Sequence, residues 1–223
     1  MAGAAEELPL FPLNVVLFPY ATLQIHVFEE RYRDMVRHCL QYDQGFGIVL
    51  IKSGSEVGGP ADPYLVGTAC RIVSVQTYDD GTMDVKIQGE RRFRIRKLDE
   101  TKSYPVGYVE PVVELEVEDT PRADALTLRT REYLQAYIEA HFQREEIKVA
   151  KVRLPQDPTA LSFVVANFLQ IDNQQKQHLL EVTDTLERIS EMIPILEQHM
   201  MEAKVPQYTK LTVQDLSEWT STN

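Results

Sequence analysis

Histidine and cysteine are the residues of this chain that could ligate a metal or attack a substrate. The five histidines are His26, His38, His141, His178 and His199. None is paired with another at helical spacing around a glutamate, which is the pattern of a zinc-dependent hydrolase. The two cysteines, Cys39 and Cys70, lie in apolar sequence that is typical of buried, inert thiols. We therefore expect no metal centre and no cysteine nucleophile.

Nucleotide and hydrolase motifs are also missing. The sequence has no G-x-x-x-x-G-K-[ST] loop, no G-x-G-x-x-G fingerprint and no G-x-S-x-G elbow. The nearest glycine cluster, GGP (58–60), runs into proline and not into a helix. The paired carboxylates of DDG (79–81) are typical of a tight turn. The sequence thus predicts a protein that is not an enzyme and needs no cofactor.

One segment could bind an anion. ERRFRIRK (90–97) carries five basic residues, and in a strand Arg92, Arg94 and Arg96 would lie on one face. That face could bind a phosphate backbone, as in an RNA-binding module, or an acidic peptide. It could instead be a solvated face whose charge prevents edge-to-edge pairing, or one that is ion-paired with acidic helices, and these structural roles are the more common ones for such a strand. The residues alone leave these alternatives open.

The overall charge disfavours nucleic acid as a partner. The 223 residues include 23 Lys and Arg against 34 Asp and Glu, a net charge of -11. An acidic surface repels phosphate backbones and anionic membranes. No apolar run approaches the roughly 20 residues needed to span a bilayer, and the start, MAGAAEE, lacks the positive charge of an export signal. With only two cysteines, we expect a cytoplasmic protein.

Glycine divides the chain into two parts. All ten glycines lie at or before Gly107. Because glycine favours turns and is disfavoured inside helices, strands are expected first and helices afterwards. The acidic stretch ELEVEDTP (114–121) lies between them. We predict a β-rich part at 1–117, a helical part at 118–205 and a polar tail at 206–223.

Six or seven short strands and one helix are expected in the first part. ATLQIHVF (21–28) alternates between apolar and polar residues, whereas residues 29–43 have helical spacing. The Asp-Gly turn favours a hairpin. Strands are predicted at 8–19, 21–28, 45–52, 66–78, 82–88, 91–98 and 104–114, with a loop at 54–63. This set suggests a small barrel or sandwich.

The second part carries helix signals. Asp157 precedes a proline at the first helical position, where the missing N–H is tolerated. Asp172 with Gln175, and Asp184 with Glu187, have the spacing of capping boxes. Helices are predicted at 121–144, 158–170, 173–182 and 185–203, with a linker or helix end at 143–156.

The last helix has a stripe with coiled-coil spacing. Spacings of three and four alternate along Leu186, Ile189, Ile193, Leu196 and Met200. This seam could join two copies of the chain, so a homo-oligomer is one alternative. It could instead pack on the chain's own helices near 126–142 and 158–180. The short seam and the internal Pro194 both weaken the case for self-association.

The opening of the chain resembles a known family. LPLFPLNVVLFPYATLQIHVFEERYRDMV (8–36) is similar to the start of the Lon protease N-terminal, or LON substrate-binding, domain. Further matches are FGIVLIK (46–52), DDGTMDVKIQGERRFRI (79–95) and YPVGYVEP (104–111), and residues 157–189 resemble the helical region of that domain. The positions that match the opening motif are Pro12, Pro19, His26, Phe28, Glu29, Arg31 and Tyr32. They could be functional, or they could only shape strand ends, packing and the start of a helix.

The resemblance implies an α+β fold, with an N-terminal PUA-like β-barrel or sandwich that carries one helix, followed by a C-terminal helical bundle. In full Lon proteases this region helps to recognise unfolded substrates and to assemble the ring, and ATPase and peptidase domains follow it. The chain looks like a stand-alone member without those domains.

By this resemblance the expected function is non-catalytic recognition of unfolded or apolar protein segments, or of a dedicated protein partner. An open strand edge, or the cleft between barrel and helices, could supply the site. A PUA-like RNA-binding module that uses the basic strand is the alternative.

Overall fold

The computed structural model describes residues 6–59, 61–143 and 154–204, with residues 139–143 and 199–204 as backbone only. Within them, seven strands and one helix precede four helices. The elements are β1 (Glu6–Leu13), β2 (Thr22–Val27), α1 (Glu30–Gln41), β3 (Phe46–Gly54), β4 (Ala61–Pro63), β5 (Val66–Thr77), β6 (Met83–Asp99), β7 (Val106–Pro111), α2 (Pro121–Gln143), α3 (Pro158–Phe168), α4 (Asn173–Glu181) and α5 (Thr185–Lys204).

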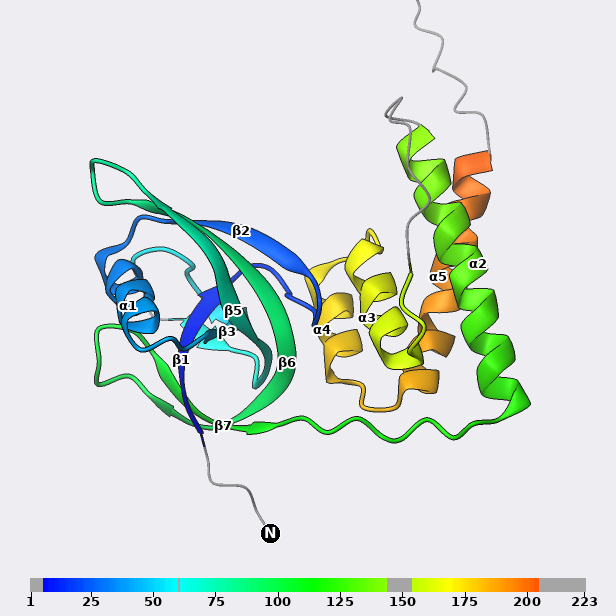
Figure 1. Ribbon diagram of the computed structural model, residues 1–223, viewed down its shortest axis with the longest axis horizontal. Coiled ribbons are helices and arrows are strands. Elements are labelled where there is room, and N and C mark those ends of the chain that lie inside the picture. The colour runs from blue at the N-terminus through cyan, green and yellow to red at the C-terminus, as the bar shows by residue number, and fades with distance from the viewer. Residues whose placement is uncertain (1–5, 60, 144–153, 205–223) are drawn as a thin grey trace, which may run out of the picture.

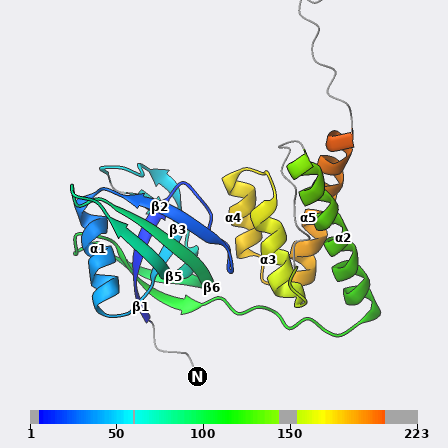
Figure 2. The ribbon, with the colours of Figure 1, turned by 45° about the horizontal axis from the view of Figure 1, so that its top comes forward.

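The strands form one mixed sheet that closes on itself. Hydrogen-bonded neighbours follow the order β1-β7-β6-β5-β3, and Leu10–Leu13 of β1 also pair in parallel with Gly47–Leu50 of β3. This parallel pairing closes the five strands into a barrel. β4 adds to β3 outside the ring, and β2 pairs with the first half of β6. Figures 1 and 2 show the barrel with α1 at one end and the other helices at the opposite end.

Three details differ from the sequence prediction. The two strands predicted at 82–88 and 91–98 form one strand, β6, whose register shift near Glu90 bends it without ending it. A short strand, β4, lies in the predicted loop. β1 ends at Leu13, because the segment up to Pro19 makes no strand pairing.

Helix α1 packs into one of two barrel cores. Its apolar stripe, Tyr32, Met35, Val36 and Cys39, is buried against inward-facing residues of β1, β2, β3 and β6. The ring of Tyr32 stacks on Phe11 with 4.0 Å between centroids. This helix therefore gives the barrel end, and with it β2, a rigid support.

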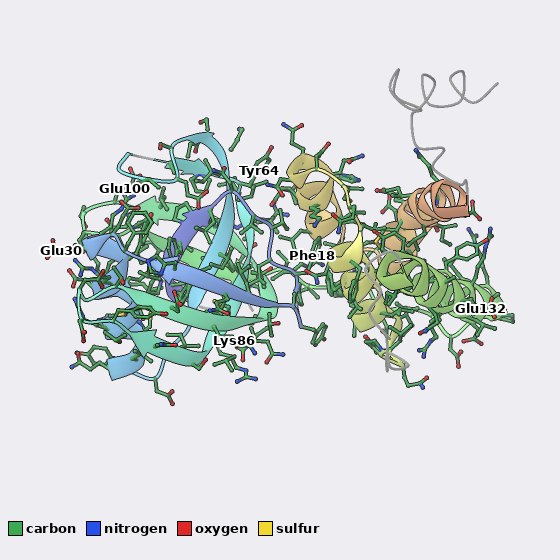
Figure 3. The ribbon with its side chains drawn as sticks, turned by 90° about the horizontal axis from the view of Figure 1, so that it is seen from above. Phe18, Glu30, Tyr64, Lys86, Glu100 and Glu132 are labelled. Atoms are coloured by element: carbon green, nitrogen blue, oxygen red, sulfur yellow. The ribbon has the colours of Figure 1, made fainter. Side chains whose placement is uncertain are left out.

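The four remaining helices share a core with the barrel. Leu134 of α2, Leu161 of α3 and Leu196 of α5 lie in one buried cluster, which also contains Val16, Phe18, Leu50 and Val66 of the barrel part. Figure 3 shows Phe18 on the side of the barrel that faces the helices. The contact between barrel and helices is thus a packed apolar interface.

Polar caps begin α3, α4 and α5 at the three aspartates that the sequence predicts. The Asp157 carboxylate accepts a hydrogen bond from the Ala160 N–H at the start of α3. Asp172 and Gln175 form a reciprocal capping box at the start of α4. At the start of α5, the Asp184 carboxylate accepts hydrogen bonds from the N–H groups of Leu186 and Glu187. These caps satisfy backbone donors that would otherwise lack partners.

The predicted association seam is used inside the chain. Ile189, Ile193 and Leu196 are buried in the helical core, together with residues of α2 and α3. Leu186 is half-buried, and the Met200 side chain lies outside the described residues. The stripe therefore packs on the chain's own helices, the second of the two alternatives. Its buried members are not available to a second copy.

No helix among the described residues is long and apolar enough to cross a membrane. The sheet gives way to helices between Pro111 and Pro121, around the predicted boundary. The predicted tail, 206–223, lies outside the described residues.

Candidate functional site

Strand β2 has one open edge. Thr22–Val27 pair with β6 along one side, and within the described residues no strand pairs with the other side. The second half of β1 lies across from this open edge, but its residues pair with β3 instead. An unpaired edge presents backbone N–H and C=O groups that can accept another strand.

A groove of about 280 Å³ runs along this edge. It is lined by Leu23, Gln24, Ile25 and His26 of β2, Phe11 and Leu13 of β1, Asn14 and Val15 of the following loop, and Glu56 of the loop before β4. Alternate side chains of a strand point to opposite faces, so four consecutive residues can line a groove only along the strand's edge. The groove therefore combines apolar side chains with an accessible backbone.

Two of the family-motif residues hold the loop that borders the groove. The Glu29 carboxylate accepts hydrogen bonds from the Arg31 Nε, at 3.1 Å, and from the Gly58 N–H, at 3.2 Å. Arg31 also donates to the Gly59 carbonyl. In the same loop, the Glu56 carboxylate accepts from the Asn14 N–H at 3.0 Å. The motif thus places Glu56 at the wall of the groove.

The other motif residues fall into two groups. Pro12, Pro19 and Tyr32 are buried, which suits a structural role. His26 and Phe28 are exposed, with their rings 6.2 Å apart. His26 Nδ1 lies 2.7 Å from the Asp84 carboxylate, which also accepts a hydrogen bond from the Tyr78 hydroxyl.

The Asp84 contacts have an electrostatic consequence. The hydrogen bond from His26, and to a lesser extent the one from Tyr78, lowers the pKa of the Asp84 carboxyl, because both bonds stabilise its charged form. Asp84 therefore stays ionised and holds the His26 side chain at one end of the groove.

The prediction that Arg92 belongs to an exposed basic surface is wrong. The strand does alternate as expected, since Phe93 and Ile95 are buried in the barrel, but the outer face at Arg92 is covered by the helices. Only 2% of Arg92 is exposed. Farther along, Arg96 is paired with Glu110, and Arg94 is half-buried. The three arginines do not form a basic surface.

Arg92 instead belongs to a buried arginine cluster, made of Arg92, Glu114, Phe163 and Arg188. Both guanidiniums pair with the single carboxylate of Glu114, which comes from the linker between β7 and α2. Their carbon atoms Cζ lie 5.2 Å (Arg92) and 4.1 Å (Arg188) from the ring centroid of Phe163, within the range of cation–π attraction. The cluster connects barrel, linker and helices.

Backbone carbonyls complete the cluster. Arg92 Nη1 donates to the carbonyls of Leu180 and Val182, at 2.5 and 2.7 Å, and Arg188 Nη1 also donates to Val182. Burial lowers the pKa of Arg92 to about 10, although Glu114 opposes this effect. Both arginines therefore remain charged near neutral pH.

Glu114 is the residue that sequence reasoning missed. From its sequence, ELEVEDTP indicates only an acidic boundary between the two parts of the chain. The available signal was the alternation of Glu114 with Val113 and Leu115. In an extended segment, alternate side chains point to opposite faces, so either the acidic or the apolar face lies against the protein. The pattern does not tell which face does so.

The thiols have environments that suppress reactivity. Burial raises the pKa of Cys39 to about 11, and burial also raises the pKa of Cys70. Thiolate is the nucleophilic form, so both thiols are poor nucleophiles near neutral pH. In the part of the chain that the structure describes, no three His, Cys, Asp or Glu side chains gather where they could hold a metal.

Comparison with known proteins identifies relatives of the whole arrangement. The chain is 24% identical to the Lon protease of Anaeromyxobacter dehalogenans over 193 residues, and 24% identical to that of Escherichia coli over 196 residues. These matches cover 86% and 87% of this chain, but only 23% and 25% of the relatives. The chain thus spans about a quarter of the length of these proteases.

Solved structures give the same match. A Lon N-terminal domain protein from Xanthomonas campestris superposes with a TM-score of 0.61 at 27% identity, over 85% of this chain and 98% of that one. The N-terminal domain of the Mycobacterium avium complex Lon protease, at 20% identity, shares the fold with a TM-score of 0.66, over 87% of this chain and all of that one.

The family comparison covers both the barrel and the helices. The model of the ATP-dependent protease La (LON) substrate-binding domain matches residues 7–198, which include the open edge of β2, the linker and most of α5. From this match and the shared fold, the chain belongs to the LON substrate-binding domain family.

Proposed function

We propose that this chain recognises extended apolar segments of other proteins by adding them as a strand to β2, and that it catalyses no reaction. The groove along Leu23–His26 carries this proposal, because it offers an unpaired strand edge beside apolar walls. In strand addition the backbone supplies affinity, and pockets for alternate side chains supply selectivity. The family's substrate-binding domain supports the same role.

The size of the groove suits side chains and not a larger ligand. Its volume of about 280 Å³ lies just below the usual range for small-molecule sites. Phe11, Leu13 and Ile25 are almost fully buried and form its floor, whereas Val15 and Leu23 are only partly covered. One or two apolar side chains of an added strand would cover these partly exposed walls.

The cleft between barrel and helices is a poorer candidate. Apolar residues of both parts fill it, and the arginine cluster closes its edge. The observed barrel and helical core support the finer architecture as well, a PUA-like barrel followed by a helical bundle.

The remaining parts of the proposal have their own support. Non-catalytic action is supported by the suppressed thiols and by a family match that is confined to a substrate-binding domain. The two free, buried cysteines support a cytoplasmic location, because oxidising compartments favour disulfides.

A charge placed in the groove should abolish recognition. We expect Val15→Glu to weaken binding of a labelled decapeptide of alternating valine and threonine by at least about tenfold, because the bound apolar side chain would desolvate the new carboxylate. Val73→Glu, at an exposed valine of β5, is the matched control and should bind normally. Fluorescence anisotropy on the full chain measures both.

Two further readouts separate strand addition from other modes. Methylating alternate backbone amides of the peptide should weaken binding, since it removes donors for the β2 edge. Binding should persist at about 0.5 M salt and show a negative heat-capacity change. If Val15→Glu and Val73→Glu bound the peptide with equal affinity, the β2 groove would not be the binding site. If the methylated and unmethylated peptides bound with equal affinity, binding would not occur by strand addition.

A further inference from the structure

The linker between β7 and α2 exposes the apolar side of an extended segment. Residues 113–118 alternate apolar and acidic side chains. Glu114 points inward to the arginine cluster, so its neighbours Val113 and Leu115 point outward. Val113 is 74% exposed and Leu115 is 58% exposed. Figure 1 shows the linker running along the side of the helices to the start of α2. Burying these two apolar side chains against a partner would remove them from water and so favour binding.

Hollows flank the linker. One, of about 550 Å³, lies against α2 and α5, and the other, of about 530 Å³, lies against α2 and the start of α3. Leu115–Glu118 line both hollows. We define the linker surface as Val113 and residues 115–119. It has room for additional side chains along both of its borders.

The backbone of the linker surface is largely unpaired. Among the described residues, its one backbone hydrogen bond runs from the Leu115 N–H to the Thr183 carbonyl, at 3.0 Å. The N–H and C=O groups of residues 116–119 have no such partner within those residues. An extended segment with free backbone groups can pair with another extended segment.

The charge around the linker surface is negative and unneutralised. Among the residues that line the two hollows, Glu114, Asp157 and Asp184 are engaged in the arginine cluster or in helix caps. Carboxylates without an ion pair to a described residue are Glu116, Glu118, Asp119, Asp124 and Glu187. Against them stands a single basic lining residue, Arg122.

We propose that the linker surface docks an extended basic segment of a partner protein, with Lys or Arg alternating with apolar residues. The apolar side chains would cover Val113 and Leu115, and the cations would meet Glu116 and Glu118. Charge complementarity selects this occupant over an acidic or a neutral segment. The surface is separate from the β2 groove, so the inference does not depend on the proposed function.

Three heptapeptides test the proposal on the full chain. One alternates lysine with valine, one lysine with serine, and one glutamate with valine. We expect saturable binding of the lysine–valine peptide, binding of the lysine–serine peptide that is at least about tenfold weaker, and no binding of the glutamate–valine peptide. Equal affinity for the two lysine peptides would show nonspecific charge attraction and overturn the proposal.

Variants then locate the binding. Leu115→Ser and Glu118→Lys should each weaken the lysine–valine peptide by about tenfold without unfolding the chain, because both side chains are exposed. Leu128→Ser on α2 is the matched control for an exposed leucine, and Val15→Glu controls for the β2 groove. Leu128→Ser should bind normally, and Val15→Glu, which blocks the β2 groove, should keep the saturable binding that Leu115→Ser and Glu118→Lys weaken. Loss of binding in Val15→Glu alone, or self-association of the free chain that Leu115→Ser abolishes, would contradict the proposal.

Discussion

Replacing Glu114 by glutamine is expected to lower the free energy of unfolding by about 3–5 kcal/mol. The Glu114 carboxylate pairs with both guanidiniums of the arginine cluster, and the side chains of Arg92 and Arg188 are 1% and 0% exposed. Glutamine keeps the shape of the side chain but removes its charge. Two buried cations would then repel each other without an anion between them.

Glu116→Gln is the matched control for this variant. Glu116 is the next acidic residue of the linker and has no ion pair with a described residue. Its replacement should change the free energy of unfolding by less than about 0.5 kcal/mol. Urea denaturation of both variants, followed by far-ultraviolet circular dichroism, makes the comparison. Equal stability of the two variants would show that the arginine cluster does not hold barrel and helices together.

The double variant Ile189→Glu with Leu196→Glu is expected to unfold the helical part. Both side chains are fully buried in the apolar core shared by α2, α3 and α5, so a carboxylate at either position would be placed among apolar side chains. Burying an unpaired charge costs several kcal/mol, so two such charges cost about as much as the total stability of a typical domain. Circular dichroism should therefore show a large loss of helix.

Leu128→Glu provides the control, because Leu128 is an exposed leucine of α2. It should leave the helix signal and the sedimentation coefficient unchanged. If the α5 stripe instead joined two copies of the chain, the double variant would be a well-folded monomer derived from an oligomer. Sedimentation velocity together with circular dichroism distinguishes that result from unfolding.

Local signals in the sequence were sufficient for most elements. The alternation of residues 21–28 predicts β2, and the aspartates before α3 and α4 predict the starts of those helices. These features depend on residues within a few positions of one another, so a single sequence contains the whole signal. The opening motif, residues 8–36, predicts the fold differently, through its resemblance to a family, and the family match over residues 7–198 agrees with it.

Features that depend on distant pairing were not predictable. An arginine on the outer face of a strand gives the same alternation in sequence whether water or another layer of the protein covers it. For this reason the sequence does not indicate that Arg92 is buried. The open edge of β2 follows from the parallel pairing of β1 with β3, between residues more than thirty positions apart. No local pattern indicates which strand edge remains unpaired in a closed sheet.

Amide hydrogen exchange on the full chain, with and without the valine–threonine decapeptide, tests the central claim most directly. Strand addition predicts slower exchange of amides within Thr22–Val27, because their outward-facing N–H groups gain hydrogen-bond partners. Amides of the linker, residues 112–120, should be unaffected by this neutral peptide. Saturable binding of the decapeptide without protection in β2 would contradict the account.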